Sequence, residues 1–382
     1  MKKALFVATV VGFIASFEKS DILMLQSMGY EVHYAANAKR INDPRKIEEL
    51  NNLGVIQHDI AFARNPFASD NIAGYNQLTA LMKQACFDLV HCHTPVGGVL
   101  GRIAAHHCRV PVVLYTAHGF HFFRGCPLKN RILFYPIEKY MSKFTDILIT
   151  INQEDFEVAN GKFHSGRTER IHGVGIEIDK FNTPGDCRDV KRAELGVCNN
   201  EILLLSVGEL DKDKNHIEVL KAMKSLAIKG FKYIVAGNGG LRRSYQQYID
   251  ENGLNESVKL LGFRRDIPEL LQAADIYVFP SLFEGLSVAL MEAVAAKMPI
   301  VCSEVRGNVD TVVTPESYFD PKDHRTLLAA IKRISGMTKD QKKTMAETNY
   351  RNLQKYRLSE VQKEMSQIYC KADEMVEERK KL

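Results

Sequence analysis

Short, continuously apolar runs alternate with helix-length segments along most of the 382-residue chain, and this rhythm constrains the fold more than any other feature. The first series of runs is ALFVA, EVHYAA, DLVHC, VPVVLYT and DILITI. Because these runs are apolar throughout, they are typical of parallel strands that helices cover on both faces. The segments between them, such as 97–107 and 127–143, have the length of helices. The first half of the chain therefore predicts a doubly wound α/β sheet.

The same rhythm restarts near Glu201. Its apolar runs are EILLLSVG, KYIVAG, VKLLG, DIYVFP and PIVCS, and the helices expected among them span 216–228, 241–252, 267–273 and 287–296. Residues 173–200, between the two series, contain glycine and proline and lack periodicity, so we interpret them as a linker. The chain thus predicts two Rossmann-like domains facing a cleft, residues 1–175 and 176–345. A charged helical segment, 346–382, is expected to cross back to the first domain.

Composition narrows the class of protein. The charged fraction of 25% and the hydrophobic fraction of 45% are ordinary for a soluble protein, and no apolar run approaches the ~18 residues of a membrane span. The N-terminus has a basic start but no clean cleavage site, so we expect Ala4–Ala8 to be a buried strand rather than part of a signal peptide. Eight cysteines without a C-x-x-C pair argue against a zinc site or a disulfide framework and for a reducing compartment. The mild net charge of +5 and the lack of a basic, aromatic stripe argue against nucleic-acid binding.

The segment PSLFEGLSVALMEAVAA, residues 280–296, follows a predicted strand and starts a helix. The first N–H groups of a helix lack intrahelical partners and lie at the positive end of its dipole, so they can bind a diphosphate. The expected donors are Gly285, Leu286 and Ser287. Glu284 and Glu292 could accept hydrogen bonds from hydroxyl groups on either side, which describes a nucleotide-sugar. The alternative is a surface carboxylate beside an ordinary helical glutamate, and the pattern alone does not decide between them.

The residues E-G-L-S-V-A-L-M-E in this segment resemble the E-x7-E motif of retaining glycosyltransferases of family 4, which have the two-domain GT-B fold. Further resemblances extend over nearly the whole chain. They are VAGNGGL (235–241), LLGFRRDIPELLQAADIYVFPS (260–281), TAHGFHFF (116–123), LITIN and HGVGIEIDKF. The last three match the subgroup that builds bacterial exopolysaccharide and capsule repeat units.

The resemblance implies roles for residues of the second domain. Glu292 is expected to bind the ribose of the nucleotide, and Glu284 is expected to hold hydroxyl groups of the transferred sugar. The backbone near Arg264 is expected to border the base. In SVGELDKDKN, Lys214 matches the phosphate-binding lysine of the family.

One position of SVGELDKDKN departs from the family pattern. The family usually has an arginine immediately after the strand glycine, and this chain has Glu209 there. The loss of a cation beside the diphosphate would weaken stabilisation of the leaving group unless another cation replaces it. Lys212 is the candidate replacement, and the alternative is that Lys212 is a solvated loop lysine.

Histidines and one glycine are the candidates in the first domain. His118 follows the strand VPVVLYT, and the resemblance makes it the active-site histidine near the transferred sugar. The alternatives are that it binds a strand-end carbonyl or that His121 points inward instead. His91 and His93 lie two apart on one face of a strand, but no further ligand accompanies them, so packing or acceptor contact is expected and no metal site. Gly12, in the expected loop TVVGFIAS, would let a donor phosphate or sugar approach the backbone, although G-x-G-x-x-G is absent.

Basic and apolar residues alternate from 121 to 144. The helix expected there would either lie on an anionic membrane or pack its apolar stripe on the sheet. By resemblance, the chain is expected to be a cytoplasmic transferase at the inner face of the plasma membrane. It would move a sugar from a nucleotide-sugar, most simply a UDP-sugar, to a saccharide acceptor linked to polyprenyl diphosphate, with no cofactor or metal. The alternatives are a nucleotide-sugar 2-epimerase on the same fold and a non-catalytic member of an assembly complex.

Overall fold

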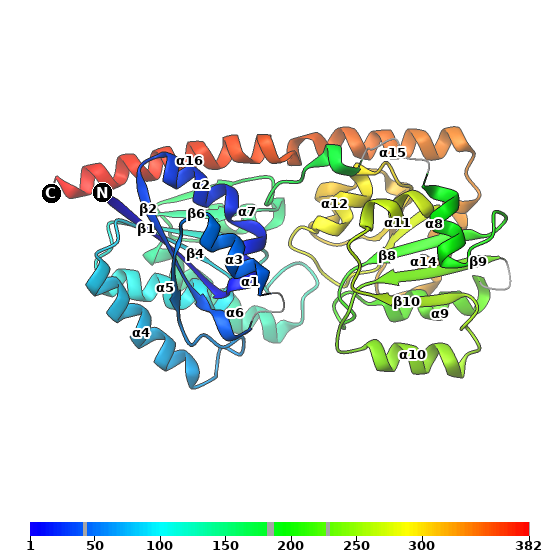
Figure 1. Ribbon diagram of the computed structural model, residues 1–382, viewed down its shortest axis with the longest axis horizontal. Helices are drawn as coiled ribbons and strands as arrows, with labels where there is room; N and C mark the ends of the chain where they lie inside the picture. Colours follow the sequence, from blue (N-terminus) through cyan, green and yellow to red (C-terminus); the bar gives the residue numbers. More distant parts are fainter. Residues whose placement is uncertain (41–43, 182–186, 227–229, 382) are drawn as a thin grey trace. The chain divides into compact units, whose positions relative to one another are not determined.

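The computed structural model describes residues 1–40, 44–181, 187–226 and 230–381 (Figure 1). The chain forms two compact units, one of Met1–Gly175 with Ser359–Leu382 and the other of Ile176–Leu358. Each unit contains one parallel sheet with helices around it. The predicted α/β architecture, with two Rossmann-like sheets, is therefore confirmed.

The sheet of the first unit has seven strands in the order β3-β2-β1-β4-β5-β6-β7. They are β1 (Lys2–Val10), β2 (Tyr30–Asn37), β3 (Ile56–Asp59), β4 (Leu89–His93), β5 (Val112–Ala117), β6 (Ile147–Thr150) and β7 (Arg167–Arg170). In β1, Ala4 pairs in register with Val32 of β2 and Leu89 of β4, so the strand order reverses beside β1. Ligands of such sheets bind at this reversal, beyond the carboxyl ends of the strands.

Helices cover both faces of this sheet. They are α1 (Val11–Phe17), α2 (Lys19–Ser27), α3 (Arg45–Asn52), α4 (Asp70–Ala85), α5 (Pro95–His107), α6 (Leu128–Met141), α7 (Gln153–Lys162) and α16 (Leu358–Lys380). Helices α4, α5 and α6 lie on one side and α2 and α16 on the other (Figure 1). The Tyr369 hydroxyl of α16 donates to Asp21 Oδ2 at 3.0 Å and lies 2.8 Å from His91 Nδ1. This buried chain of polar contacts fastens α16 to the sheet.

Glycines allow α5 to approach the sheet closely. A Cβ atom on Gly98 would lie 2.5 Å from the Tyr115 ring, far inside van der Waals contact. The fully buried guanidinium group of Arg102 stacks 3.8 Å from the centre of the same ring and donates to Glu138 Oε2 of α6 at 2.8 Å. An ion pair at this depth is costly to break, because the partner left behind would be a buried charge. It therefore holds α6 against α5.

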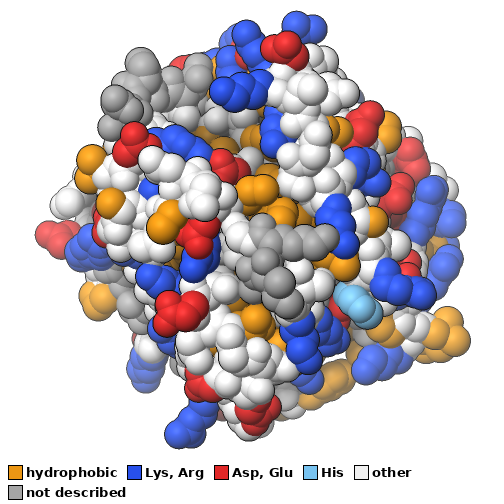
Figure 2. Space-filling view, turned by 90° about the vertical axis from the view of Figure 1, so that its right-hand side faces the viewer, with side chains coloured by type: hydrophobic (Ala, Val, Ile, Leu, Met, Phe, Trp, Pro, Cys, Tyr) orange, Lys and Arg blue, Asp and Glu red, His pale blue; other side chains and the backbone are white. Residues whose placement is uncertain are grey.

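The sheet of the second unit has six strands in the order β10-β9-β8-β11-β12-β13. They are β8 (Ile202–Val207), β9 (Phe231–Ala236), β10 (Val258–Gly262), β11 (Ile276–Phe279), β12 (Ile300–Ser303) and β13 (Tyr318–Phe319). Its helices are α8 (Arg188–Leu195), α9 (His216–Leu226), α10 (Arg242–Glu251), α11 (Ile267–Ala273), α12 (Val288–Ala295), α13 (Asn308–Thr311), α14 (His324–Ser335) and α15 (Lys339–Leu353). On the face shown in Figure 2, basic and acidic side chains are interspersed, as the mild net charge leads one to expect.

Two expectations about the order of elements need correction. The expected linker 173–200 contains α8, which belongs to the second unit. Residues 182–186 of the expected linker lie outside the described ranges. The segment from 346 does not belong to the first unit as a whole, because Leu353 and Tyr356 are buried in the core of the second unit. Only the part from Ser359 onward joins the first unit.

Gly12 is also placed differently from the expectation. Strand β1 runs on to Val10 and α1 begins at Val11, so Gly12 lies in the first turn of a helix rather than in a loop. The helix expected at 216–228 is described as far as Leu226, and residues 227–228 lie outside the described ranges. Among the helices in the described ranges, none is both long and apolar enough to cross a bilayer.

Candidate functional site

The loop between β11 and α12 ends in a capped helix, as the sequence predicts. Ser287 is the N-cap of α12, and its Oγ accepts a hydrogen bond from the Leu290 N–H at 3.3 Å. Within the described ranges, the backbone N–H groups of Gly285, Leu286 and Ser287 donate to no residue of the chain. Together with the first turn of α12, these groups form a cluster of donors at the positive end of a helix dipole. Such a cluster can bind an anion.

The segment after β12 holds this loop in place. Ser303 Oγ donates to the Ser281 carbonyl at 2.5 Å, and Arg306 Nε donates to the Glu284 carbonyl at 3.0 Å. Gly307 has φ of +78°, and a Cβ there would lie 2.5 Å from the Gly285 carbonyl oxygen. The sequence analysis missed Arg306 and Gly307. The sequence feature that could have indicated them is an arginine and a glycine shortly after the run PIVCS, which ends at the same edge of the sheet as the loop.

Lys214 and Glu284 meet beside the loop. Lys214 Nζ donates to Glu284 Oε1 at 2.5 Å and lies 5.5 Å from the centre of the Phe279 ring. Both side chains are mostly buried, with 26% and 10% of their surfaces exposed. The pair places one cation at the loop that carries these N–H groups and fixes a carboxylate beside it.

Glu292 lies in α12 and is partly buried. Burial raises the pKa of its carboxyl group to about 7. Among the described residues, its carboxylate has no hydrogen-bond or ion-pair partner. A partly buried carboxylate without a protein partner has lost part of its hydration, and hydroxyl groups of a ligand would supply donors to it. The geometry therefore suits the expected contact with a ribose.

The side chains at three other predicted positions of the second unit are exposed or are paired with other residues. The side chains of Glu209 and Lys212 are exposed on the loop after β8. The guanidinium group of Arg264 donates to Asp266 Oδ1 at 2.7 Å and to Glu194 Oε1 at 2.8 Å, and these hydrogen bonds raise its pKa. Its side chain therefore joins α8 to the start of α11. The expectation for Arg264 concerned its backbone and stays a prediction.

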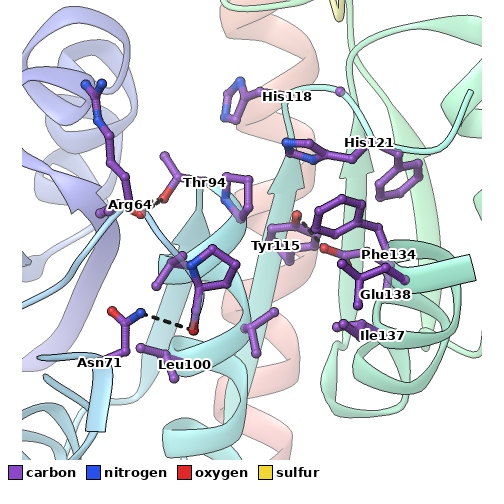
Figure 3. A pocket seen from close by; sticks show the side chains of 18 of the residues that line it. Arg64, Asn71, Thr94, Leu100, Tyr115, His118, His121, Phe134, Ile137 and Glu138 are labelled. Carbon is purple, nitrogen blue, oxygen red and sulfur yellow. Dashed lines mark hydrogen bonds between the residues drawn. The ribbon is translucent and has the colours of Figure 1, made fainter. Parts of the chain in front are cut away.

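The first unit has a cavity of about 740 Å³ beyond the carboxyl ends of β1, β4 and β5 (Figure 3). Residues at the ends of these strands or just after them line it, among them Val10, Thr94 and His118. Thr94 has φ of +62°, an unusual value for a β-branched residue, and its Oγ1 accepts a hydrogen bond from the Thr9 N–H at 2.9 Å. Such strain is common at binding sites, where the surrounding structure enforces it.

Both histidines of TAHGFHFF line this cavity. His118 Nε2 lies 3.3 Å from His93 Nδ1, and its ring packs edge-on against Phe13 with centroids 4.7 Å apart. Burial lowers the pKa of His118 to about 4, so its imidazole is neutral near pH 7 and can hydrogen-bond without adding charge. His121 packs against Phe134 with ring centroids 4.8 Å apart. A Cβ on Gly12, next to Phe13, would meet no atom within 4 Å.

His93 has a neighbour that the sequence analysis did not expect. Glu18 Oε1 lies 3.4 Å from His93 Nδ1, and candidate ligand atoms of Glu18, His93 and His118 all lie within 4.8 Å of one another. These are ligand types that divalent transition metals accept. His91, by contrast, is held between Tyr369 and Thr116 Oγ1, and its burial lowers its pKa to about 3. His91 is therefore a packing residue.

Known protein families match both units. The model described as "Glycosyl transferases group 1" matches residues 188–351, and "Glycosyl transferase 4-like" matches residues 5–152. The chain is 37% identical over 324 residues to the putative glycosyltransferase EpsD of Bacillus subtilis, covering 83% of each chain. The chain belongs to this family of glycosyltransferases. The two matched segments lie in different units, so this glycosyltransferase has both parts of the family's architecture.

Two further similarities are informative. The chain is 31% identical over 237 residues to the UDP-Gal:alpha-D-GlcNAc-diphosphoundecaprenol alpha-1,3-galactosyltransferase of Escherichia coli, covering 60% of this chain and 61% of that protein. The crystal structure of Anabaena Alr3699/HepE in complex with UDP and glucose superposes with a TM-score of 0.77 at 19% identity, covering 97% of this glycosyltransferase and all of that chain. The second likeness shows that the fold is shared.

The shifted pKa of Glu292 predicts a pH dependence of donor binding. The carboxylate is ionised above pH 7 and protonated below it, and a protonated carboxyl loses acceptor capacity for ribose hydroxyls. The affinity for UDP-glucose, measured by calorimetry, should fall roughly tenfold from pH 8 to pH 6. Glu292→Gln should bind more weakly at pH 8 and lose this dependence. Glu316→Gln, at an exposed glutamate of the same unit, should keep it.

The same variant has a predicted effect on stability. A carboxyl whose pKa is raised by folding stabilises the folded state only while it is protonated, and this contribution is lost as the pH rises through 7. Glu292→Gln should therefore unfold at an equal or higher temperature than wild type at pH 8, although it binds the donor more weakly. A pH-independent wild-type affinity, or a clear loss of stability in the variant, would contradict the assignment.

Proposed function

We propose that this glycosyltransferase moves a sugar from a UDP-sugar held by the second unit to a saccharide on polyprenyl diphosphate held by the first, with retention of configuration. One observation carries the donor half of the proposal. Among the described residues, three N–H groups without a partner in the chain lie just before α12, the Lys214 cation pairs with Glu284 of the same loop, and the Glu292 carboxylate, also without a partner, lies in α12. This combination matches the diphosphate and the flanking hydroxyl groups of a nucleotide-sugar.

The second unit would act on the bond that breaks. In the transfer, the bond between the anomeric carbon and the diphosphate oxygen breaks, a bond to the acceptor oxygen forms, and the acceptor hydroxyl loses its proton. Negative charge then grows on the departing diphosphate. Donors that already point at this charge lower the barrier, because they need no reorganisation during the reaction. The N–H groups of the loop and Lys214 would supply this stabilisation, and Glu284 would hold the transferred sugar.

Relatives support the acceptor class. The Escherichia coli relative is named for an acceptor on diphosphoundecaprenol, and so is a relative from Campylobacter jejuni that is 25% identical over 205 residues. In the first unit, His118 would contact the sugar through a neutral imidazole. A neutral ring can donate one hydrogen bond and accept another, which suits hydroxyl groups.

We also propose that α6 contacts the membrane in which such a lipid lies. Leu128 and Ile132 are exposed on α6, while Lys129 and Arg131 place positive charge next to them. The other side of the same helix, including Phe134, packs against the core of the first unit. The helix therefore also has the packing role that the sequence offered as the alternative. An exposed apolar surface with basic neighbours favours anionic lipid headgroups.

Membrane contact has a direct test in vesicle flotation. The wild-type protein should float with vesicles that contain phosphatidylglycerol, and 1 M salt should weaken this binding because it screens the basic residues. Replacing both Leu128 and Ile132 by aspartate should abolish most of the flotation. Val190→Asp, at an exposed residue of α8, is the control and should float like wild type. Equal flotation of all three proteins would show that α6 is not the contact.

Turnover tests the donor site and the absence of a metal requirement together. A panel of nucleotide-sugars is incubated with lipid-linked acceptors in EDTA, and UDP release and product mass are followed. Lys214→Ala should lower kcat about 100-fold and change donor affinity much less, because the charge that Lys214 stabilises grows in the transition state. Lys212→Ala should change kcat only slightly, since Lys212 is exposed.

The controls separate catalysis from folding. Lys214→Ala leaves a mostly buried Glu284 without its partner, so a double variant with Glu284→Gln shows whether any loss comes from instability. Loss of turnover in EDTA with recovery on zinc addition would replace the metal-free mechanism by one that uses Glu18, His93 and His118. UDP-N-acetylglucosamine that epimerises without an acceptor would replace transfer by isomerisation.

A further inference from the structure

The cavity of the first unit has a lining poorly suited to a sugar alone. Apolar side chains form most of its wall, among them Phe13, Phe67, Val99, Leu100, Phe134 and Ile137. The hydroxyl groups of a sugar would lose water in such a place without gaining hydrogen-bond partners, which costs free energy. The volume of about 740 Å³ lies within the usual range for pockets that bury a small molecule. The wall therefore suits an apolar group of a ligand.

Three basic or imidazole side chains of the cavity, Arg64, His118 and His121, lie toward one end, whereas the polar side chains near the other end, Asn71 and Glu138, are hydrogen-bonded within the protein. In Figure 3, the Arg64 guanidinium group lies at the height of His118, with His121 close below, and Leu100 and Ile137 lie at the opposite end. Arg64 is exposed, and its side chain has no partner among the described residues. A free arginine at this position can bind a phosphate group with two hydrogen bonds.

The loop that carries Arg64 is held by α4. Asn71 Oδ1 accepts a hydrogen bond from the Ala63 N–H at 2.9 Å, and Asn71 Nδ2 donates to the Pro66 carbonyl at 3.3 Å. The Asn71 side chain is buried, so these bonds are shielded from water. The backbone on both sides of Arg64 is therefore fixed, so its side chain starts from a defined position beside the cavity.

Exposed apolar residues flank the cavity on two sides. Phe67, before α4, is 77% exposed, and Leu133 and Ile137 of α6 are also exposed. All three line the cavity as well. Contiguous exposed apolar surface marks a site for an apolar partner. The cavity wall thus continues into the exposed face of α6, where Leu128 and Ile132 lie.

We propose that this cavity binds the first isoprene units of a polyprenyl diphosphate, with the diphosphate at Arg64 and the sugar beside His118. The inference rests on the proposed function and adds where the lipid lies. Such an acceptor has a polar end, made of a sugar and an anionic group, and an apolar chain. The cavity has His118 and Arg64 together at one end and an apolar wall that extends from them to Leu100 and Ile137 at the other. A phospholipid acyl chain lacks the sugar and would leave His118 without a role.

Binding of sugar-free prenyl diphosphates tests this inference without turnover. The probes are farnesyl diphosphate, with three isoprene units, and isopentenyl diphosphate, with one, both in detergent-free buffer. Wild-type protein should bind farnesyl diphosphate at least about tenfold more tightly, because more apolar surface leaves water. Arg64→Ala should weaken the binding of both probes.

Variants of the apolar lining residues test whether the cavity wall binds the prenyl chain. The double variant Phe67→Ser and Ile137→Ser should bind farnesyl diphosphate no more tightly than isopentenyl diphosphate. Both residues are partly exposed, so the fold should survive, and an unchanged amide NMR spectrum of the first unit away from the cavity would confirm this. Leu23→Ser, at an exposed apolar residue of α2 on the other side of the sheet, is the matched control and should keep the wild-type preference.

The outcomes separate this inference from the proposed function. Equal affinities for the two probes, or a wild-type preference in the double variant, would overturn the cavity assignment even if the enzyme still transfers sugar to a lipid-linked acceptor. Equal competition by lysophosphatidylglycerol would assign the cavity to membrane phospholipid instead. Failure of the proposed function would appear elsewhere, as the absence of UDP release with every donor and acceptor.

Discussion

The unpaired backbone N–H groups at the amino end of α12 are the feature on which the second unit depends. N–H groups without acceptors would lower the stability of a protein interior, yet several contacts of the chain hold these groups in place. Ser287 caps the helix, the Arg306 side chain holds the Glu284 carbonyl, and Gly307 leaves room for Gly285. Because an anion is the natural partner for such a cluster, the architecture makes sense when a diphosphate occupies it.

Burial creates the chemical properties of the other candidate residues. It raises the pKa of Glu292 to about 7 and lowers the pKa of His118 to about 4, so in both cases it disfavours the charged form. Neither effect helps the folded state, and the positive φ of Thr94 adds a local cost. Costs of this kind are typical of binding sites, where function takes precedence over stability.

Much of the fold was predictable because it follows from local pattern. The run VKLLG is strand β10 and residues 267–273 are helix α11, with the bounds expected. Strands β3, β7 and β13 were missed because they are short, and IQHD and RTER carry few apolar residues at the edges of the first sheet. The α8 helix was hidden in a segment whose glycine and proline indicated a linker.

The site was predictable in part. The start of α12 followed from its sequence, and Lys214 and Glu292 were named by resemblance. The meeting of Glu18 with His93, and of Lys214 with Glu284, depends on how distant segments pack, which no local pattern encodes. The cavity beside Arg64 depends likewise on α4, α5 and α6 together.

The most direct measurement of the central claim is backbone NMR of the protein titrated with UDP and, separately, with uridine. If the diphosphate binds at the amino end of α12, the amide signals of Gly285, Leu286 and Ser287 should shift strongly with UDP and hardly at all with uridine. Shifts that are the same for both ligands, or that appear only in residues of the first unit, would contradict the account.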